Sequence, residues 1–379
     1  MKTQIQLAVG LIIRILVVLL LLASAQSTLH AQLVADGASR TIDGLGTNLA
    51  SDLVVGTNGV FTTLVITNAG TVTNSGNGYI GRNGVSISNR VFVVGANSVW
   101  QNGGTISVGD NGSFNQLTVS NAALVANSTA YVGRSVGRGN QALVTGANSR
   151  WLSAGEMIVG DFNGSNQLWI ANGGLVASTS FGRIGNSAAG SNNLVVVTDA
   201  ASLWTNQLTL YVGASGSFNR LVVTNGGRVE SGGANIGLNS GSISNLALMT
   251  GTNSIWRSSQ NLILGSSGAY NTLIVSNGGG FECLGGTIGN LASGDTNLAI
   301  VTGTNSSWAL STLAVGINGS FNQLVVTNGG SLVSDDCYVS ATGLQNAAAI
   351  TTRSSSPDRV RPGQIPVFSP SGISVATIV

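Results

Sequence analysis

The sequence of 379 residues predicts an all-β fold, a parallel β-helix or β-solenoid of about twelve turns with 24 to 28 residues in each turn. Three observations predict this fold. Tryptophan recurs about every 52 residues, an apolar residue followed by glycine recurs about twice as often, and the runs between these marks alternate in polarity. A fixed period of this length is typical of proteins that stack one structural repeat on the next.

The tryptophans show the longer period. They end the words NSVW, NSRW, ASLW, NSIW and NSSW, with gaps of 51, 53, 52 and 52 residues, and only Trp169 lies outside the series. Residues one period apart lie above one another in a stacked repeat, so the sequence predicts a structural column on alternate turns. Exposed rings at these positions would instead form a platform for stacking on sugars. The predicted column contains Trp100, Trp151, Trp204, Trp256 and Trp308.

The apolar–glycine pairs show the shorter period. Their glycines are separated by gaps of 24 to 28 residues, so each unit of about 52 residues divides into two unequal turns. The series contains Gly56, Gly81, Gly109, Gly133, Gly160, Gly185, Gly213, Gly237, Gly265, Gly289 and Gly316.

Within a turn, the residues alternate as a strand requires. In NQLVVTNGG, Leu324, Val326 and Asn328 are expected on one side of the strand, with Val325 and Thr327 on the other. The following Asn-Gly-Gly predicts a turn with positive φ. Equivalent asparagines on alternate turns are expected to form a structural ladder of stacked amides. These are Asn121, Asn172, Asn225, Asn277 and Asn328.

The chain divides into four segments. Residues 1–25 read as a secretory signal, with cleavage after the ASA at 23–25 or as late as residue 31. Residues 32–50 are expected to form an N-terminal cap, and residues 51–345 the repeats. All four prolines lie between 357 and 370, and proline disrupts the interior of a strand, so residues 346–379 are expected to form a tail.

Composition excludes several classes of protein. Charged residues make up 7% of the chain and the net charge is +2, with no basic stripe, so no nucleic acid is expected as a partner. No stretch after residue 25 approaches the roughly 18 apolar residues of a membrane-spanning helix. No transmembrane segment is therefore expected after the signal is removed.

The repeat words resemble those of a known group. VGxxGSFNxLxVxNGGxxxS alternates with IGxxxGSxNxLxxVTGxNSxW over about residues 50–340. These words resemble the β-strand repeats of proteins associated with type V secretion (autotransporters) and with PEP-CTERM sorting. The resemblance implies an exported, passenger-like β-solenoid at the cell surface, outer membrane or outside the cell. It implies no particular catalytic chemistry.

The sequence offers little for catalysis. His30 is the only histidine and lies beside the expected cleavage sites, so a mature chain lacks a His-based catalytic or metal site. We predict no catalytic residues, no metal and no cofactor. Cys283 and Cys337 are 54 residues apart, about two turns, which is beyond disulfide reach if each turn rises about 4.8 Å. Both are therefore expected to be free and partly buried.

These observations predict an exported solenoid with a structural or adhesive role and no enzymatic activity. A long uncharged rod repeats the same polar groups many times, which suits multivalent contact with surface polysaccharide or other matrix components. One alternative is a polysaccharide lyase or hydrolase built on a β-helix, which a cluster of acids in one groove would favour. Another is a passenger fragment with no function of its own.

Overall fold

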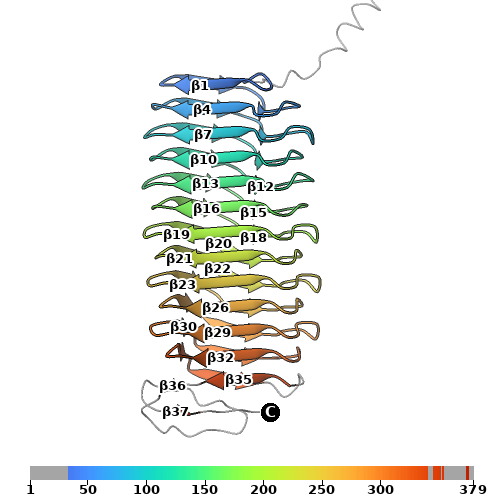
Figure 1. Cartoon of the computed structure of the whole chain (residues 1–379), viewed down its shortest axis with the longest axis vertical. Coiled ribbons are helices and arrows are strands. Elements are labelled where there is room, and N and C mark those ends of the chain that lie inside the picture. The colour runs from blue at the N-terminus through green and yellow to red at the C-terminus, as the bar shows by residue number, and fades with distance from the viewer. Residues whose placement is uncertain (1–32, 340–344, 351, 354–372, 375–379) are drawn as a thin grey trace, which may run out of the picture.

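The computed structural model describes residues 33–339, 345–350, 352–353 and 373–374. It confirms the predicted β-solenoid, because the turns stack as a single rod in chain order (Figure 1) and strands of successive turns pair in parallel. Over these residues the chain forms strands and turns and no helix. Each complete turn contributes to three strand-bearing faces, which we call the first, second and third face.

The first face is a sheet of thirteen strands. Neighbouring strands are one turn apart in the sequence, so an equivalent residue lies at each level of the stack. The strands are β1 (Ser39–Asp43), β4 (Thr63–Thr67), β7 (Arg90–Val94), β10 (Gln116–Ser120), β13 (Gln141–Thr145), β16 (Gln167–Ala171), β19 (Leu194–Thr198), β21 (Arg220–Thr224), β23 (Leu246–Thr250), β26 (Thr272–Ser276), β29 (Leu298–Thr302), β32 (Gln323–Thr327) and β35 (Ala347–Ile350).

The second and third faces form one sheet, because β20 (Leu203–Val212) and β22 (Arg228–Ile236) run through both. The other strands of the second face are β2 (Gly46–Leu49), β5 (Thr71–Asn74), β8 (Val99–Asn102), β11 (Leu124–Asn127), β14 (Arg150–Ser153), β17 (Leu175–Ser178), β24 (Ile255–Ser258), β27 (Gly280–Glu282), β30 (Ser307–Ala309) and β33 (Ser331–Val333). Those of the third face are β3 (Leu53–Val55), β6 (Gly78–Ile80), β9 (Ile106–Val108), β12 (Ala130–Val132), β15 (Met157–Val159), β18 (Gly182–Ile184), β25 (Leu262–Leu264), β28 (Gly285–Ile288), β31 (Thr312–Val315) and β34 (Asp336–Val339).

The core is one continuous apolar column inside the three faces. Leu324 and Val326 of β32 are fully buried, and the same two positions are buried in the other first-face strands from β4 to β29. Asn328 and Gly329 follow β32 with φ values of 51° and 82°, as the predicted turn requires. The short strands therefore bury their apolar side chains only through stacking on neighbouring turns.

The ends of the rod differ from the predicted segments. Residues 33–50, expected as a cap, contribute β1 and β2, which pair in register with β4 and β5 and form the first turn of the solenoid. At the other end β35 pairs with β32, so the first face continues beyond residue 345. The short strands β36 (Thr352–Arg353) and β37 (Ile373–Ser374) pair antiparallel. The expected signal at 1–25 and most of the tail lie outside the described residues.

Candidate binding surface

The predicted tryptophan column lies in the core. All five side chains are fully buried. Trp204, for example, lies in register between Val176 of the turn before and Val229 of the turn after. Because no part of these rings reaches solvent, they are not a platform for sugars. The tryptophan outside the series, Trp169 on β16, is 38% exposed on the first face.

The asparagines expected to form a ladder occupy exposed turns. Their φ values lie between 50° and 60°, so the backbone has left the strand conformation and the side chains no longer follow its inward–outward alternation. The amide of Asn225 donates to the hydroxyl of Thr198 at 3.2 Å, one turn earlier, and Asn328 does the same to Thr302 at 3.3 Å. Because these asparagines lie on alternate turns, their amides do not bond to one another. The prediction of a ladder at these positions is therefore wrong.

A buried asparagine ladder exists at another position, just before each first-face strand from β7 to β35. The Oδ1 of Asn219 accepts the main-chain N–H of Asn193 at 3.0 Å and its Nδ2–H at 2.9 Å. Asn219 in turn donates both groups to Oδ1 of Asn245, at 2.9 and 3.1 Å. From β7 to β35 the ladder includes every turn and consists of Asn89, Asn115, Asn140, Asn166, Asn193, Asn219, Asn245, Asn271, Asn297, Asn322 and Asn346.

This ladder explains the repeated apolar–glycine pair. Gly213 has a φ of 77°, and a Cβ at this residue would collide with the side chain of Asn245. The repeated glycine and the ladder asparagine of the next turn therefore pack against each other. From Gly81 to Gly316, each of these glycines is followed six to eight residues later by a ladder asparagine, so this near-constant offset marks the ladder in the sequence.

The outward side of the third face carries a row of aromatic and polar residues. Consecutive members of the row are paired in register on adjacent turns, so the row runs lengthwise along the rod. It contains Tyr79, Ser107, Tyr131, Ile158, Arg183, Tyr211, Asn235 and Ile263. We call it the third-face row.

A second line of alternating charge adjoins the third-face row. Arg82, Asp110, Arg134 and Asp161 each follow the glycine that ends a third-face strand, and they stack on successive turns. The guanidinium of Arg134 lies 3.6 Å from the carboxylate of Asp110 and 5.1 Å from the ring centre of Tyr131. Arg82 lies 4.8 Å from the ring centre of Tyr79. The guanidinium groups of this line therefore pack against the aromatic rings of the third-face row.

Arg183 joins the acidic and aromatic parts of the surface. Its guanidinium donates to both carboxylate oxygens of Glu156, at 3.0 and 3.2 Å. The same guanidinium lies 4.8 Å from the ring centre of Phe181 and 5.0 Å from that of Tyr211. This cation–π contact helps to orient the ring of Tyr211.

Burial changes the titration of the acids in this surface. Loss of hydration raises the pKa of Asp110, against the opposing charges of Arg134 and Arg82. Loss of hydration also raises the pKa of Asp161, while a hydrogen bond from Nδ2 of Asn186, at 2.7 Å, opposes that shift. Each acid is held by a neighbouring donor or cation. Within the described residues, no three His, Cys, Asp or Glu side chains cluster to hold a metal ion.

The pKa of Asp161 leads to a prediction. A carboxyl whose pKa is higher in the folded than in the unfolded state binds its proton more tightly when folded, so it destabilises the fold when ionised. The contribution of Asp161 to the free energy of unfolding should therefore rise as the pH falls from neutrality to the pKa that this carboxyl has in the unfolded chain. Asp161→Asn should raise the urea midpoint at neutral pH and flatten this dependence. An unchanged pH profile in urea unfolding from neutral to mildly acidic pH would contradict this assignment.

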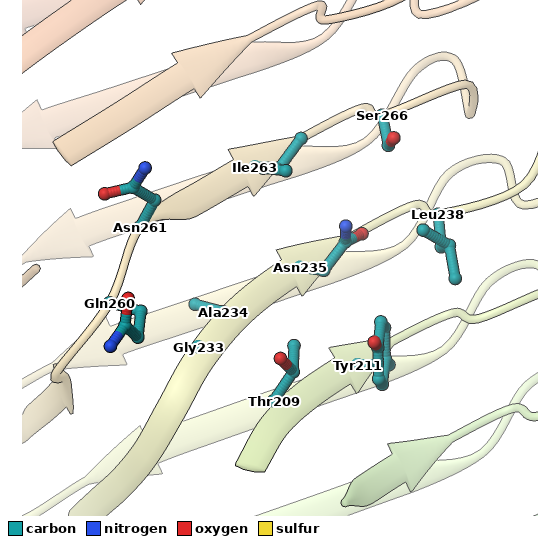
Figure 2. Close-up of a pocket in the computed structure, with 10 residues that line it drawn as sticks. All are labelled: Thr209, Tyr211, Gly233, Ala234, Asn235, Leu238, Gln260, Asn261, Ile263 and Ser266. Carbon is teal, nitrogen blue, oxygen red and sulfur yellow. The ribbon is translucent and has the colours of Figure 1, made fainter.

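A shallow pocket of about 340 Å³ lies on the third face, at the C-terminal side of Tyr211. Figure 2 shows its lining residues on three stacked strands, with Tyr211, Leu238 and Ser266 toward the loops and Gln260 and Asn261 at the opposite side. Gly233 and Ala234 are among the lining residues, and their small side chains leave the space open. The pocket thus combines one aromatic ring with several amides.

Two buried polar atoms of the third-face row have no hydrogen-bond partner. Asn235 lines the pocket and is 4% exposed, yet its Oδ1 is unpaired. The hydroxyl of the fully buried Ser107 is also unpaired. Buried polar groups are nearly always paired, so each of these atoms has free hydrogen-bonding capacity.

The two cysteines contribute no reactive group to this surface. Both are free, as their spacing predicts. Cys283 is partly buried and accepts a hydrogen bond from Nε1 of Trp308 at 3.5 Å. Burial raises the pKa of Cys283 to about 11 and that of Cys337 to about 12. Neither thiol therefore ionises appreciably near neutral pH.

Similarity between this chain and known proteins is low. No family model and no curated protein matches it. Among solved structures it is similar to the TibC-catalysed, hyper-glycosylated TibA fragment, at 12% identity and a TM-score of 0.32, covering 81% of this chain and 100% of that one. We transfer no residue role from that structure. Within the described residues, no helix has the length and apolar character to span a bilayer.

Proposed function

We propose that this protein is an exported, structural and adhesive β-solenoid that binds an extended surface polysaccharide along its third face. The observation that carries the proposal is the third-face row, with Tyr211 oriented by Arg183 and the unpaired Oδ1 of Asn235 beside the pocket. Aromatic rings stack on the C–H faces of sugars, while amides and guanidinium groups bond to hydroxyls. Repetition along the rod supports many weak contacts to one chain.

Substitution of Tyr211 tests the proposed surface. Tyr211→Ala should weaken retention of the protein by immobilised polysaccharides about fivefold to thirtyfold, because it removes one aromatic contact worth roughly 1–2 kcal/mol. The measurement is a glycan-array and affinity-electrophoresis screen, followed by titration of the best polysaccharide. Tyr270→Ala is the matched control, since Tyr270 is exposed on a loop outside the third-face row. Equal binding by both variants would contradict the proposal.

Export to the cell surface is tested separately. Antibodies to the solenoid should label intact cells as strongly as permeabilised ones. Labelling only after permeabilisation would contradict the adhesive role, whatever the protein binds in solution.

A second candidate function is cleavage of the bound polysaccharide. It is favoured by the raised pKa values of Asp110 and Asp161, because a carboxyl whose pKa moves toward neutral pH is better suited to acid–base chemistry. The same polysaccharides should be incubated with the protein and examined for new reducing ends or unsaturated products. Pure binding predicts no products. Products that disappear in Asp161→Asn would establish the enzymatic alternative.

A further inference from the structure

The central outward column of the first face is apolar along nearly its whole length. The third residue of each strand points outwards, and these residues stack in register from β4 to β32. They are Val65, Phe92, Thr118, Leu143, Trp169, Val196, Val222, Leu248, Ile274, Ile300 and Val325. We call them the outer stripe. Only Thr118 in this set is polar.

Such a composition is typical of strands that are covered on both sides. Strands with one solvated side alternate apolar with polar residues, whereas strands buried on both sides are apolar throughout. The words LVVVT, LALMT and LAIVT in β19, β23 and β29 are of the second kind. The outward side of the second face differs, since it carries the ion pairs Arg228–Glu230 and Arg257–Glu282. The apolar outer stripe is therefore particular to the first face.

Charge is nearly absent around the outer stripe. Among the outward positions of β4 to β32, only Arg90 and Arg220 are charged, and both lie at the start of a strand. The outward residues at the ends of these strands are mostly threonine or serine. A partner with many charges would lose hydration here without gaining ion pairs.

The apolar character extends into the loops that lead to the first face. Phe61, Phe114, Phe218 and Phe321 each lie two residues before a first-face strand and are 45–65% exposed. All four have φ values of 56° to 59°, an uncommon conformation for a bulky residue. Large exposed side chains thus border the outer stripe at four levels of the stack.

We propose that the first face binds a second copy of this chain, so that the protein is a homodimer packed sheet against sheet. Thirteen strands at about 4.8 Å give a face about 58 Å long, and five residues at about 3.3 Å give a width of about 16 Å. Each copy would contribute roughly 900 Å², against about 800 Å² per partner in a standard stable interface. A copy of the same uncharged face also has the same spacing, which lets side chains from both sheets interdigitate at every turn.

Two-fold symmetry makes the location of the contact specific. In a closed dimer the same patch is used on both copies. With full overlap, the central strand faces its own copy whether the two rods run parallel or antiparallel. That strand is β19, seventh of the thirteen, and Val196 is its member of the outer stripe.

The molecular mass in solution tests the dimer. The mature protein should sediment at twice the mass of one chain, and Leu248→Glu combined with Ile274→Glu should raise the dissociation constant at least about 100-fold, because the dimer would bury unpaired charges. Leu152→Glu on β14 is the control, since Leu152 points outwards on the second face and should leave the dimer intact. Circular dichroism checks that all variants fold. A monomeric wild type, or a dimer that survives both glutamates, would overturn the proposal.

Chemical cross-linking gives a test that needs no disruptive substitution. Two copies of Val196→Cys should be joined by a thiol-reactive cross-linker that spans about 10 Å, because both copies of this residue lie close to the two-fold axis and packed sheets are about 10 Å apart. Thr205→Cys on the second face is the control and should not be cross-linked at the same protein concentration. The native thiols do not compete, since burial raises both pKa values. Equal cross-linking of both variants would contradict the proposed interface. Neither experiment depends on binding to polysaccharide.

Discussion

Asn219→Ala is expected to lower the free energy of unfolding by about 3–5 kcal/mol, because it leaves two buried donors of Asn193 without an acceptor. The same change removes the donation from Nδ2 of Asn219 to Oδ1 of Asn245, whereas the main-chain N–H of residue 219 still donates to that oxygen. The ladder is continuous from Asn89 to Asn346, so one break in the middle separates two halves of a hydrogen-bonded chain.

Unfolding by urea, followed by circular dichroism, measures this loss. Because a solenoid opens locally, hydrogen exchange of the amides of Asn193 and Asn245 should also accelerate more than exchange several turns away. The control is Asn225→Gly, which removes an exposed amide but accommodates the positive φ at this turn. It should change the free energy of unfolding by less than about 1 kcal/mol. Similar losses in the two variants would mean that the ladder is not a principal source of stability.

Trp256→Ala is expected to destabilise the fold by about 3–5 kcal/mol, because it leaves a cavity among well-packed side chains. The ring packs edge-on against Phe281, with centroids 5.2 Å apart, and Nε1–H donates to Oγ of Ser231 at 2.9 Å. Phe162→Ala removes an aromatic side chain that is 62% exposed and lies outside the first face, so it should change stability by less than about 1 kcal/mol. Comparable urea midpoints for the two variants would contradict the assignment of the column to the core.

Substitutions by phenylalanine separate the effects of volume and hydrogen bonding. Nε1–H of Trp151 donates to Oδ1 of Asn127 at 2.7 Å, whereas Nε1–H of Trp204 is buried without a partner. Trp151→Phe leaves a buried acceptor without its donor, so it should cost more than Trp204→Phe, which removes an unpaired donor. The reverse order would show that packing differences outweigh the hydrogen bond.

The solenoid itself was predictable because its repeat is visible in the amino-acid sequence. The glycine spacing predicts turns of 24 to 28 residues, and the alternation in NQLVVTNGG predicts strands that end in a positive-φ turn. Both signals depend on residues close together in the sequence. The tryptophan column also followed from spacing, and it lies in the core without reaching solvent.

The ladder shows where this reasoning failed. Alternation was extended from Leu324 and Val326 to Asn328, but the backbone leaves the strand conformation at Asn328, with a φ of 51°. Its side chain consequently points to solvent. The buried amide belongs to Asn322, which lies just before the strand and packs on the glycine one turn earlier.

By itself, the sequence determined the repeat, the strands and the stacked core, since each depends on local polarity and on a constant period. The tertiary structure decided which side chains share a surface. Tyr79, Arg82, Asp110 and Tyr131 come from three successive turns, and no local pattern relates them. Their contacts depend on the register between turns, because a shift of one residue would move each side chain to the opposite side of its sheet. For the same reason, only the folded rod shows that the apolar residues of the outer stripe form one continuous face.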